Sequence, residues 1–330
     1  MSDNTSKRIE YIDLTKGFCI ILVILYHLQS FYSVQLCTDA FLFSFFLSTF
    51  VFVSGFFFNN QKGFKYFIKS KTNSLLIPFF FFYITTSVLV PNIAHYVLGI
   101  HIQTVVGWPS LWAFIIPCEF PNIPLWFLWC LYITNFLFFL ISYTRRILII
   151  GFICILLGFV GFLFQWKGSQ LPAFLNNVLM FMPFFFVGHL YKKKGMFRRI
   201  KKKKTTIIIT IVAGIITWFI SITLKDTEKF YLTLLRYYIA GIIGAFFILF
   251  LSRWIHQLSY VTYLGRYSIA ILVTHDLLIL AFSQISKFFP LPHYAQVFLV
   301  LSCVLLCYTF LIPLMRKYFA FFIAQKELIH

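Results

Sequence analysis

Charged residues are scarce in this chain of 330 residues: Asp, Glu, Lys and Arg make up 11% of it, whereas 61% is hydrophobic. A soluble globular domain of this size would expose far too much apolar surface with such a composition. The low charge therefore excludes a soluble protein and favours a chain that lies mostly in lipid.

Cysteine pairs of the kind that bind metal or form compact disulfides are also absent. The chain has seven cysteines, no Cys-x-x-Cys pair, and most of the cysteines lie inside apolar stretches. We interpret them as small apolar packing residues, so neither a disulfide framework nor a metal site is expected.

Long apolar runs dominate what is present. A bilayer core about 30 Å thick needs ~20 apolar residues per helix, and these runs are continuous, unlike the alternating strands of a barrel. We predict an all-α, polytopic integral membrane protein with about ten transmembrane helices, in which residues 1–330 form a single domain. The polar start leads into a first membrane helix and not into a removed signal peptide. The predicted spans are residues 17–36, 40–58, 74–98, 125–142, 147–166, 173–191, 205–224, 234–252, 268–288 and 296–315.

The net charge of +19 comes from basic residues that gather between the spans, most densely in 192–204. A cytoplasmic N-terminus places 23 of the 28 Lys and Arg residues on the inner side, as the positive-inside rule requires. We therefore predict that both termini are cytoplasmic, with an N-terminal segment 1–16 and a tail 316–330. The basic residues then serve topology and lipid contact, and no nucleic-acid partner is expected.

Ionisable groups inside membrane spans are costly, so each is a candidate functional residue. The first helix carries three of them: Asp13 and Lys16 at its inner edge and His27 deeper in the span. Successive residues of a helix turn by 100°, so Lys16 and His27 lie about 20° apart and Asp13 lies about 40° away, all on one face. At ~1.5 Å per residue, His27 lies roughly 16 Å deeper than Lys16.

A buried histidine stays neutral at pH 7 and can accept a proton from a hydroxyl group. That is the property required of a general base for acyl transfer to an alcohol, although a lone histidine also serves as a packing residue. Lys16 suits a phosphate-bearing donor. His275 and Asp276 occupy another span, and their side chains are expected to diverge by about 100° and not to be partners.

Residues 8–27, RIEYIDLTKGFCIILVILYH, resemble the opening motif of the membrane acyltransferase-3 family through Asp13, Lys16, Gly17 and His27. The Lys-Gly pair is similar to the branch of fucose 4-O-acetylases. Five further segments resemble family motifs in the same order: FVFVSGFFF (50–58) with Ser54, KSKTNSLLIPFFFFY (69–83) with Lys69 and Lys71, PLWFLWCLY (124–132), PFFFVGHLYKK (183–193) and YLGRYSIAILVTHDLL (263–278) with His275.

The resemblance implies a membrane-bound O-acyltransferase of the bacterial cytoplasmic membrane. Its donor would be an acyl-CoA, usually acetyl-CoA, and its acceptor a sugar hydroxyl of a cell-surface glycan or glycan precursor. It implies His27 as the catalytic base, with Lys16 and Asp13 positioning the donor or fixing the start of the helix. No metal is expected.

Five other residues have open assignments. Lys69 and Lys71 either bind the phosphates of CoA or only set topology, and Ser54 either contacts the donor or lets helices pack closely. His275 has a catalytic or a structural role. Glu119, in the outer connection 99–124, meets a sugar or is a solvated loop residue.

A transporter or flippase for a lipid-linked sugar is the alternative function. It would require charged residues scattered through several spans, and here they are few. A polysaccharide polymerase or ligase would require a large polar outer loop, whereas 99–124 is short and apolar.

Overall fold

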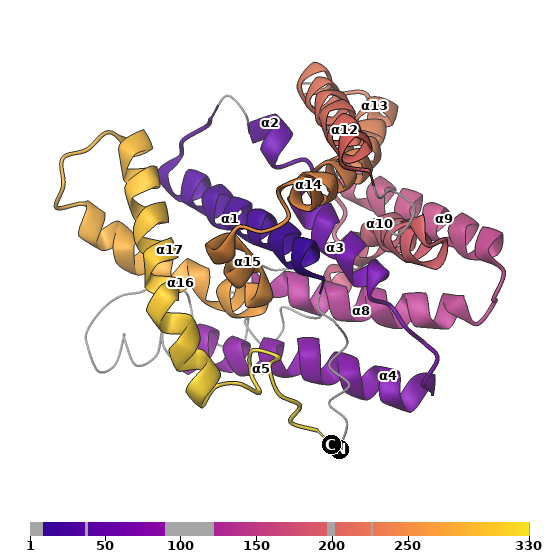
Figure 1. Ribbon diagram of the computed structural model, residues 1–330, viewed down its shortest axis with the longest axis horizontal. Coiled ribbons are helices and arrows are strands. Elements are labelled where there is room, and N and C mark those ends of the chain that lie inside the picture. Colours follow the sequence, from indigo (N-terminus) through magenta and orange to yellow (C-terminus); the bar gives the residue numbers. More distant parts are fainter. Residues whose placement is uncertain (1–8, 37–38, 90–121, 197–201, 226, 330) are drawn as a thin grey trace.

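The computed structural model describes residues 9–36, 39–89, 122–196, 202–225 and 227–329. Their secondary structure is entirely helical, with no strand in these ranges. The elements (Figure 1) are α1 (Glu10–Tyr32), α2 (Asp39–Leu42), α3 (Phe46–Phe56), α4 (Gly63–Lys71), η1 (Thr72–Leu76), α5 (Ile77–Ile84), η2 (Thr85–Leu89), α8 (Leu125–Ser142), α9 (Ile147–Trp166), η3 (Pro172–Phe174), α10 (Leu175–Lys193), α12 (Lys203–Thr223), α13 (Phe230–Leu235), η4 (Arg236–Ala240), α14 (Gly241–Ile255), α15 (Ser259–Arg266), α16 (Ser268–Ser286) and α17 (His293–Tyr318).

Nine segments of the described chain are long and apolar enough to cross a membrane. Each corresponds to one of the predicted spans, so the prediction of an all-α, polytopic membrane protein is confirmed. The remaining predicted span, 74–98, is helical as far as Leu89, and the rest of it lies outside the described residues. α1 begins at Glu10, seven residues before the predicted start, which brings Asp13 and Lys16 into the helix itself.

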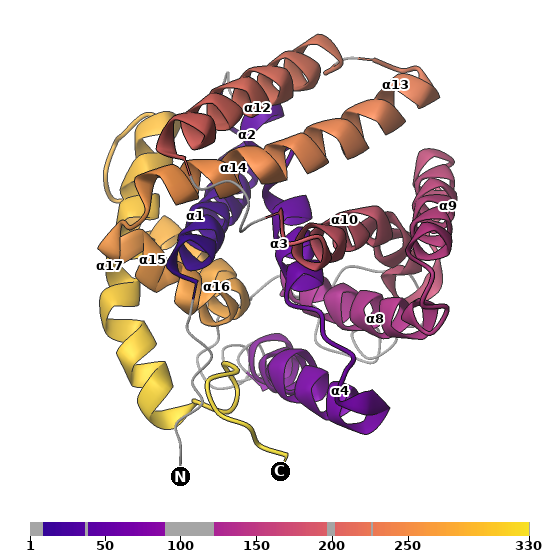
Figure 2. The ribbon, with the colours of Figure 1, turned by 45° about the vertical axis from the view of Figure 1, so that its right-hand side comes forward.

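Helix α1 lies inside the bundle, where it packs against α3, α14, α15, α16 and α17. α10 lies between α3 and α9, and α12 runs along α14 on one side of the molecule (Figure 2). Large apolar side chains on α9, α12 and α17, such as Leu148 and Phe310, are exposed and suit contact with lipid. Asp13 of α1 and His275 of α16 are instead buried inside the bundle.

Small residues bring the inner helices into close contact. A Cβ atom added to Gly55 of α3 would overlap the carbonyl oxygen of Phe185, and one added to Gly188 of α10 would overlap that of Phe52. Glycine at such positions lets membrane helices approach closely. The prediction that small residues of the segment 50–58 let helices pack closely is therefore confirmed for Gly55.

Candidate active site

The inner end of α1 is fixed by ion pairs around Asp13. One carboxylate oxygen of Asp13 lies 2.7 Å from Nζ of Lys16, and the other lies 3.6 Å from Nε of Arg266, at the end of α15. Glu10 adds a second carboxylate 3.9 Å from Arg266. Asp13 thus orients Lys16 and ties α1 to α15.

Two glycines allow this contact between α1 and α15. A Cβ atom on Gly265 would overlap the carbonyl oxygen of Asp13, and a Cβ atom on Gly17 would overlap that of Val261. Neither position has room for a larger side chain without moving backbone. The Lys-Gly pair of α1 and Gly265 of the late motif therefore meet in space and set the position of Lys16.

Toward the other end of α1, three ionisable side chains meet. Nδ1 of His27 lies 3.6 Å from Oδ1 of Asp276, and Nε2 of His275 lies 3.6 Å from the same oxygen. The two imidazole rings are edge to face, with centroids 5.0 Å apart. His27 is five residues from the C-terminal end of α1, so it lies nearer that end of the helix than the middle.

The backbone decides which nitrogen of His275 carries the proton. Nδ1 of His275 lies 3.0 Å from the carbonyl oxygen of Ile271, which can only accept a hydrogen bond, so Nδ1 is the donor. In the neutral ring Nε2 then carries the lone pair, and because an ionised Asp276 carboxylate also only accepts, their 3.6 Å contact is not a hydrogen bond. For His27, the contact of Nδ1 with the Asp276 carboxylate favours a proton on Nδ1, which leaves Nε2 as the basic nitrogen.

Exposure separates the two histidines. The side chain of His275 is 0% exposed, whereas that of His27 is 20% exposed and that of Asp276 is 25% exposed. A substrate can therefore reach His27 while His275 lies behind it. The site thus has the parts of a general-base site: His27 as the base, Asp276 as the carboxylate that orients it, and His275 as a buried supporting imidazole.

The expectation that His275 and Asp276 are not partners is wrong. The hydrogen bond from Nδ1 of His275 to Ile271 turns the ring along the helix, so Nε2 comes to the side where the Asp276 carboxylate lies. The 100° offset along the backbone is bridged by the length of the two side chains. Both residues face His27.

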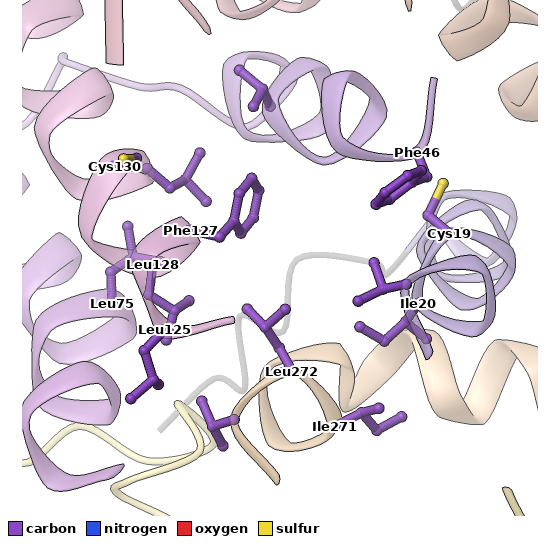
Figure 3. Close-up of a cluster of buried hydrophobic side chains, with 14 of the residues drawn as sticks. Cys19, Ile20, Phe46, Leu75, Leu125, Phe127, Leu128, Cys130, Ile271 and Leu272 are labelled. Atoms are coloured by element: carbon purple, nitrogen blue, oxygen red, sulfur yellow. The ribbon is translucent and has the colours of Figure 1, made fainter. Parts of the chain in front are cut away.

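A cavity of about 220 Å³, the central cavity, lies along α1 on the N-terminal side of this cluster and is lined by residues of α1, α3, η1, α8 and α16. Figure 3 shows its apolar wall, with Ile20 and Leu272 facing Phe127 and Leu128 across it. Lys16, Ser54 and Lys71 also line it. The structure therefore brings together three residues that the sequence placed in separate motifs.

Ser54 is held in place by α8. Nδ2 of Asn135 donates to Oγ of Ser54 at 3.0 Å and to the carbonyl oxygen of Leu131 at 2.7 Å. Ser54 thus accepts a hydrogen bond from behind while its side chain borders the cavity. Asn135 is a supporting residue that the sequence motifs do not mark.

Lys71 ends α4, a helix outside the candidate spans, and is half-buried. Burial and then the charge of Lys192 lower the pKa of the Lys71 ammonium group to about 8. Its Nζ lies 5.9 Å from the centroid of the Phe67 ring. A cation held in such an apolar setting gains free energy when an anion approaches it.

The other predicted site residues are placed differently. Lys69 is two residues from Lys71 on α4, which turns it away by about 200°, and it is not among the residues that line the central cavity. A role for Lys69 in donor binding stays a prediction. Glu119 lies outside the described residues.

The cluster of His27, His275 and Asp276 also has the donors for a metal ion. One ligand atom from each residue lies within 4.8 Å of the others. Two imidazoles and a carboxylate are a donor set that zinc accepts in catalytic sites. The geometry therefore permits two chemistries at the same three residues.

Two residues were passed over at the sequence level. Asp276 is an acid inside a predicted span, but the sequence motif includes only its neighbour His275, so the sequence assigned a functional role to His275 alone. Arg266 was counted as a topological charge, although it follows Gly265 directly in the motif. The ion pair with Asp13 gives Arg266 a part in fixing the site.

Comparison with known proteins agrees with this arrangement. The sequence profile of the acyltransferase 3 family, described as "Acyltransferase domain", matches residues 9–314. No curated protein and no solved structure matches the chain. The matched range contains the ion pairs of α1, the central cavity and the histidine cluster. Because the match covers nearly the whole chain, the protein belongs to the acyltransferase 3 family and is an integral membrane acyltransferase.

Proposed function

We propose that the protein transfers an acyl group, most simply acetyl, from acyl-CoA to a sugar hydroxyl of a cell-surface glycan or its precursor in the bacterial cytoplasmic membrane. The observation that carries this proposal is one line of groups along α1. Lys16 and Ile20 line the central cavity, and His27, backed by Asp276, lies farther along the same helix.

The cavity fits the arm of an acyl-CoA. Its cationic end, with Lys16 and Lys71, suits a phosphate, and its apolar wall suits the uncharged chain that carries the thioester. Leu272 is the cavity residue nearest in sequence to His275, three residues or roughly 5 Å along α16. An acyl group held at Leu272 is therefore about one helical turn from the imidazole cluster.

The reaction follows from the protonation states of the cluster. Nε2 of His27 takes the proton of the acceptor hydroxyl while the hydroxyl oxygen attacks the thioester carbonyl carbon. The C–S bond then breaks, the electron pair leaves with the sulfur, and the imidazolium returns its proton to the thiolate. The products are the acyl ester and free CoA. The Asp276 carboxylate stabilises the imidazolium and keeps Nε2 directed to the substrate.

The distribution of charge supports a transferase over a flippase. A translocation pathway needs polar groups at several depths. Along α1 the ionisable groups instead form two groups: Asp13 with Lys16 near its start, and His27 with His275 and Asp276 near its end. Two such groups on either side of an apolar cavity suit a donor site and a reaction site.

The test uses purified full-length protein in detergent with radiolabelled acetyl-CoA. We expect release of free CoA that depends on an added pool of monosaccharides and glycan fragments, with label transferred to one of them. Butyryl-CoA and succinyl-CoA are run in parallel to define the acyl group. Folded protein that turns over none of these donors, yet moves a labelled lipid-linked sugar across vesicles, would support the flippase instead.

A further inference from the structure

A second cavity, the basic cavity, lies at the end of the bundle that carries the basic loops, between the ends of α3, α8 and α10. Its volume is about 710 Å³, within the range of roughly 300–1,000 Å³ for small-molecule sites. Arg145, Lys192 and Lys193 line it, and no acidic residue is among the lining residues. Three cations without a carboxylate favour a ligand with several negative charges.

Neutral hydrogen-bonding groups complete the lining. Asn59, Asn60 and Gln61 form the turn between α3 and α4, and all three border the basic cavity. The turn is held by a hydrogen bond from Nδ2 of Asn60 to Oγ of Ser142, at 3.0 Å. Amides beside cations are suited to a ligand that combines phosphates with a polar base or sugar.

His189 adds a polar atom that lacks a partner. It borders the basic cavity, and its Nδ1 is buried with no hydrogen-bond partner in the described part of the chain. The rings of Phe58 and Phe138 pack edge to face against its imidazole, with centroids 5.5 Å and 5.3 Å away. A buried polar atom without a partner is unfavourable, and a bound ligand that supplies a partner removes that cost.

The backbone at Arg145 is strained. Its φ is 55°, in the left-handed region that residues other than glycine rarely adopt. The turn is closed by a hydrogen bond from the N–H of Arg145 to the carbonyl oxygen of Ser142, at 3.1 Å. The turn that borders the basic cavity therefore has an arginine, Arg145, at a backbone conformation that would favour glycine.

The basic cavity and the central cavity are lined by consecutive residues of the chain. Phe57 lines the central cavity and its neighbour Phe58 lines the basic one. The charge of Lys192, in the basic cavity, contributes to the lowered pKa of Lys71, in the central one. One extended ligand can therefore place phosphates in the basic cavity and a chain in the central cavity.

We propose that the basic cavity binds the 3′-phosphorylated adenosine diphosphate part of the acyl donor. This inference rests on the proposed function and deepens it, because it assigns the nucleotide of CoA to Arg145, Lys192 and Lys193. The acyl-bearing arm then runs past Lys71 into the central cavity toward His27.

The experiment measures binding of adenosine 3′,5′-bisphosphate to the full-length protein by titration calorimetry. Variants R145N and K192Q are compared with R146N, which removes the adjacent exposed arginine that does not line the basic cavity. Asn tolerates a left-handed φ, so R145N removes the charge without adding strain. Melting temperatures equal to that of the native protein establish that the variants are folded. If R145N does not fold, K192Q alone tests the basic cavity.

We expect binding in the native protein, at least tenfold weaker binding in R145N and K192Q, and no change in R146N. The KM for acetyl-CoA should rise at least tenfold in the same two variants. Turnover of S-acetylpantetheine, which lacks the nucleotide, should be unchanged. Equal effects of R145N and R146N would show that general surface charge and not the basic cavity is responsible, and would overturn the proposal.

The remaining outcomes separate this proposal from the proposed function. Native protein that turns over acetyl-CoA but does not bind the bisphosphate would overturn the inference and leave the transferase intact. Bisphosphate binding that is lost in R145N, without turnover of any acyl-CoA, would support the phosphate site and overturn the transferase. Displacement of the bisphosphate by phosphatidylglycerol in mixed micelles, but not by inorganic phosphate, would show a lipid headgroup site and overturn the inference.

Discussion

Nδ1 of His27 and Oδ1 of Asp276 lie 3.6 Å apart, although most of the chain separates the two residues in sequence. The contact joins α1 to α16 inside the bundle. It assigns each residue a different part: His27, with a side chain 20% exposed, is the residue that a substrate can reach, and Asp276 orients it. The distance is longer than a hydrogen bond, as is common for catalytic pairs without substrate.

The variant D276N should lower kcat for acyl transfer roughly 100-fold, because an amide does not stabilise the imidazolium that forms on His27. The KM for acetyl-CoA should stay within about threefold, since Asp276 does not line the central cavity. Initial rates of CoA release measure both quantities. A roughly 100-fold rise of KM with unchanged kcat would indicate that Asp276 contributes to donor binding or folding and does not assist His27 as the base.

Lys71 should make donor binding depend on pH. Its pKa of about 8 means that it is charged at pH 7 and becomes neutral as the pH rises through 8. Phosphate binding favours the charged form, so affinity should be full below pH 8 and fall above it, with a proton taken up on binding near pH 9. We expect the KM for acetyl-CoA to rise roughly tenfold between pH 7 and pH 9.5.

The variant K71R is the matched test of that pH effect, because arginine stays charged throughout this range. Its KM should be nearly flat up to pH 9.5, whereas K65R, at an exposed position of the same helix, should follow the native profile. The charges that face Lys71 are those of Lys192 and of Lys16 across the central cavity. An unchanged profile in K71R would assign the pH effect to one of these lysines.

The crossing of α1 and α15 should be sensitive to one methyl group. G265A places a Cβ atom against the carbonyl oxygen of Asp13, so backbone must move, at a cost of about 1–3 kcal/mol. Thermal unfolding in detergent should show a lower melting temperature. G214A is the control, because its Cβ would meet only ring carbons of Phe247, at 3.0 Å. An equal fall in melting temperature in G265A and G214A would mean that the close contact between α1 and α15 does not determine stability.

Chelators should leave turnover unchanged, because the proposed reaction needs the free Nε2 of His27. Added Zn²⁺ should inhibit, since it can bind His27, His275 and Asp276 together and block the base. Turnover is measured after dialysis against EDTA and again with micromolar Zn²⁺. Activity that disappears with EDTA and returns with zinc would show that the cluster is a metal site.

The sequence predicted most of the fold because each span is a continuous apolar run whose length alone is diagnostic. It also placed Asp13, Lys16 and His27 on one face of α1, since helical periodicity decides this locally. It did not show that Asp276 meets His27, because that contact depends on how α1 and α16 pack. Lys71 and Lys69 look alike in sequence, and only the packing of α4 separates them.

The most direct measurement compares H27Q and H275Q for binding of radiolabelled acetyl-CoA and for release of CoA in a single turnover. We expect both variants to bind the donor as the native protein does. H27Q should lower the rate of release by about 10³-fold, because the general base is gone. H275Q should lower it about tenfold, because the buried ring only supports the site. Release that survives in H27Q and is lost in H275Q would contradict the assignment of His27 as the base.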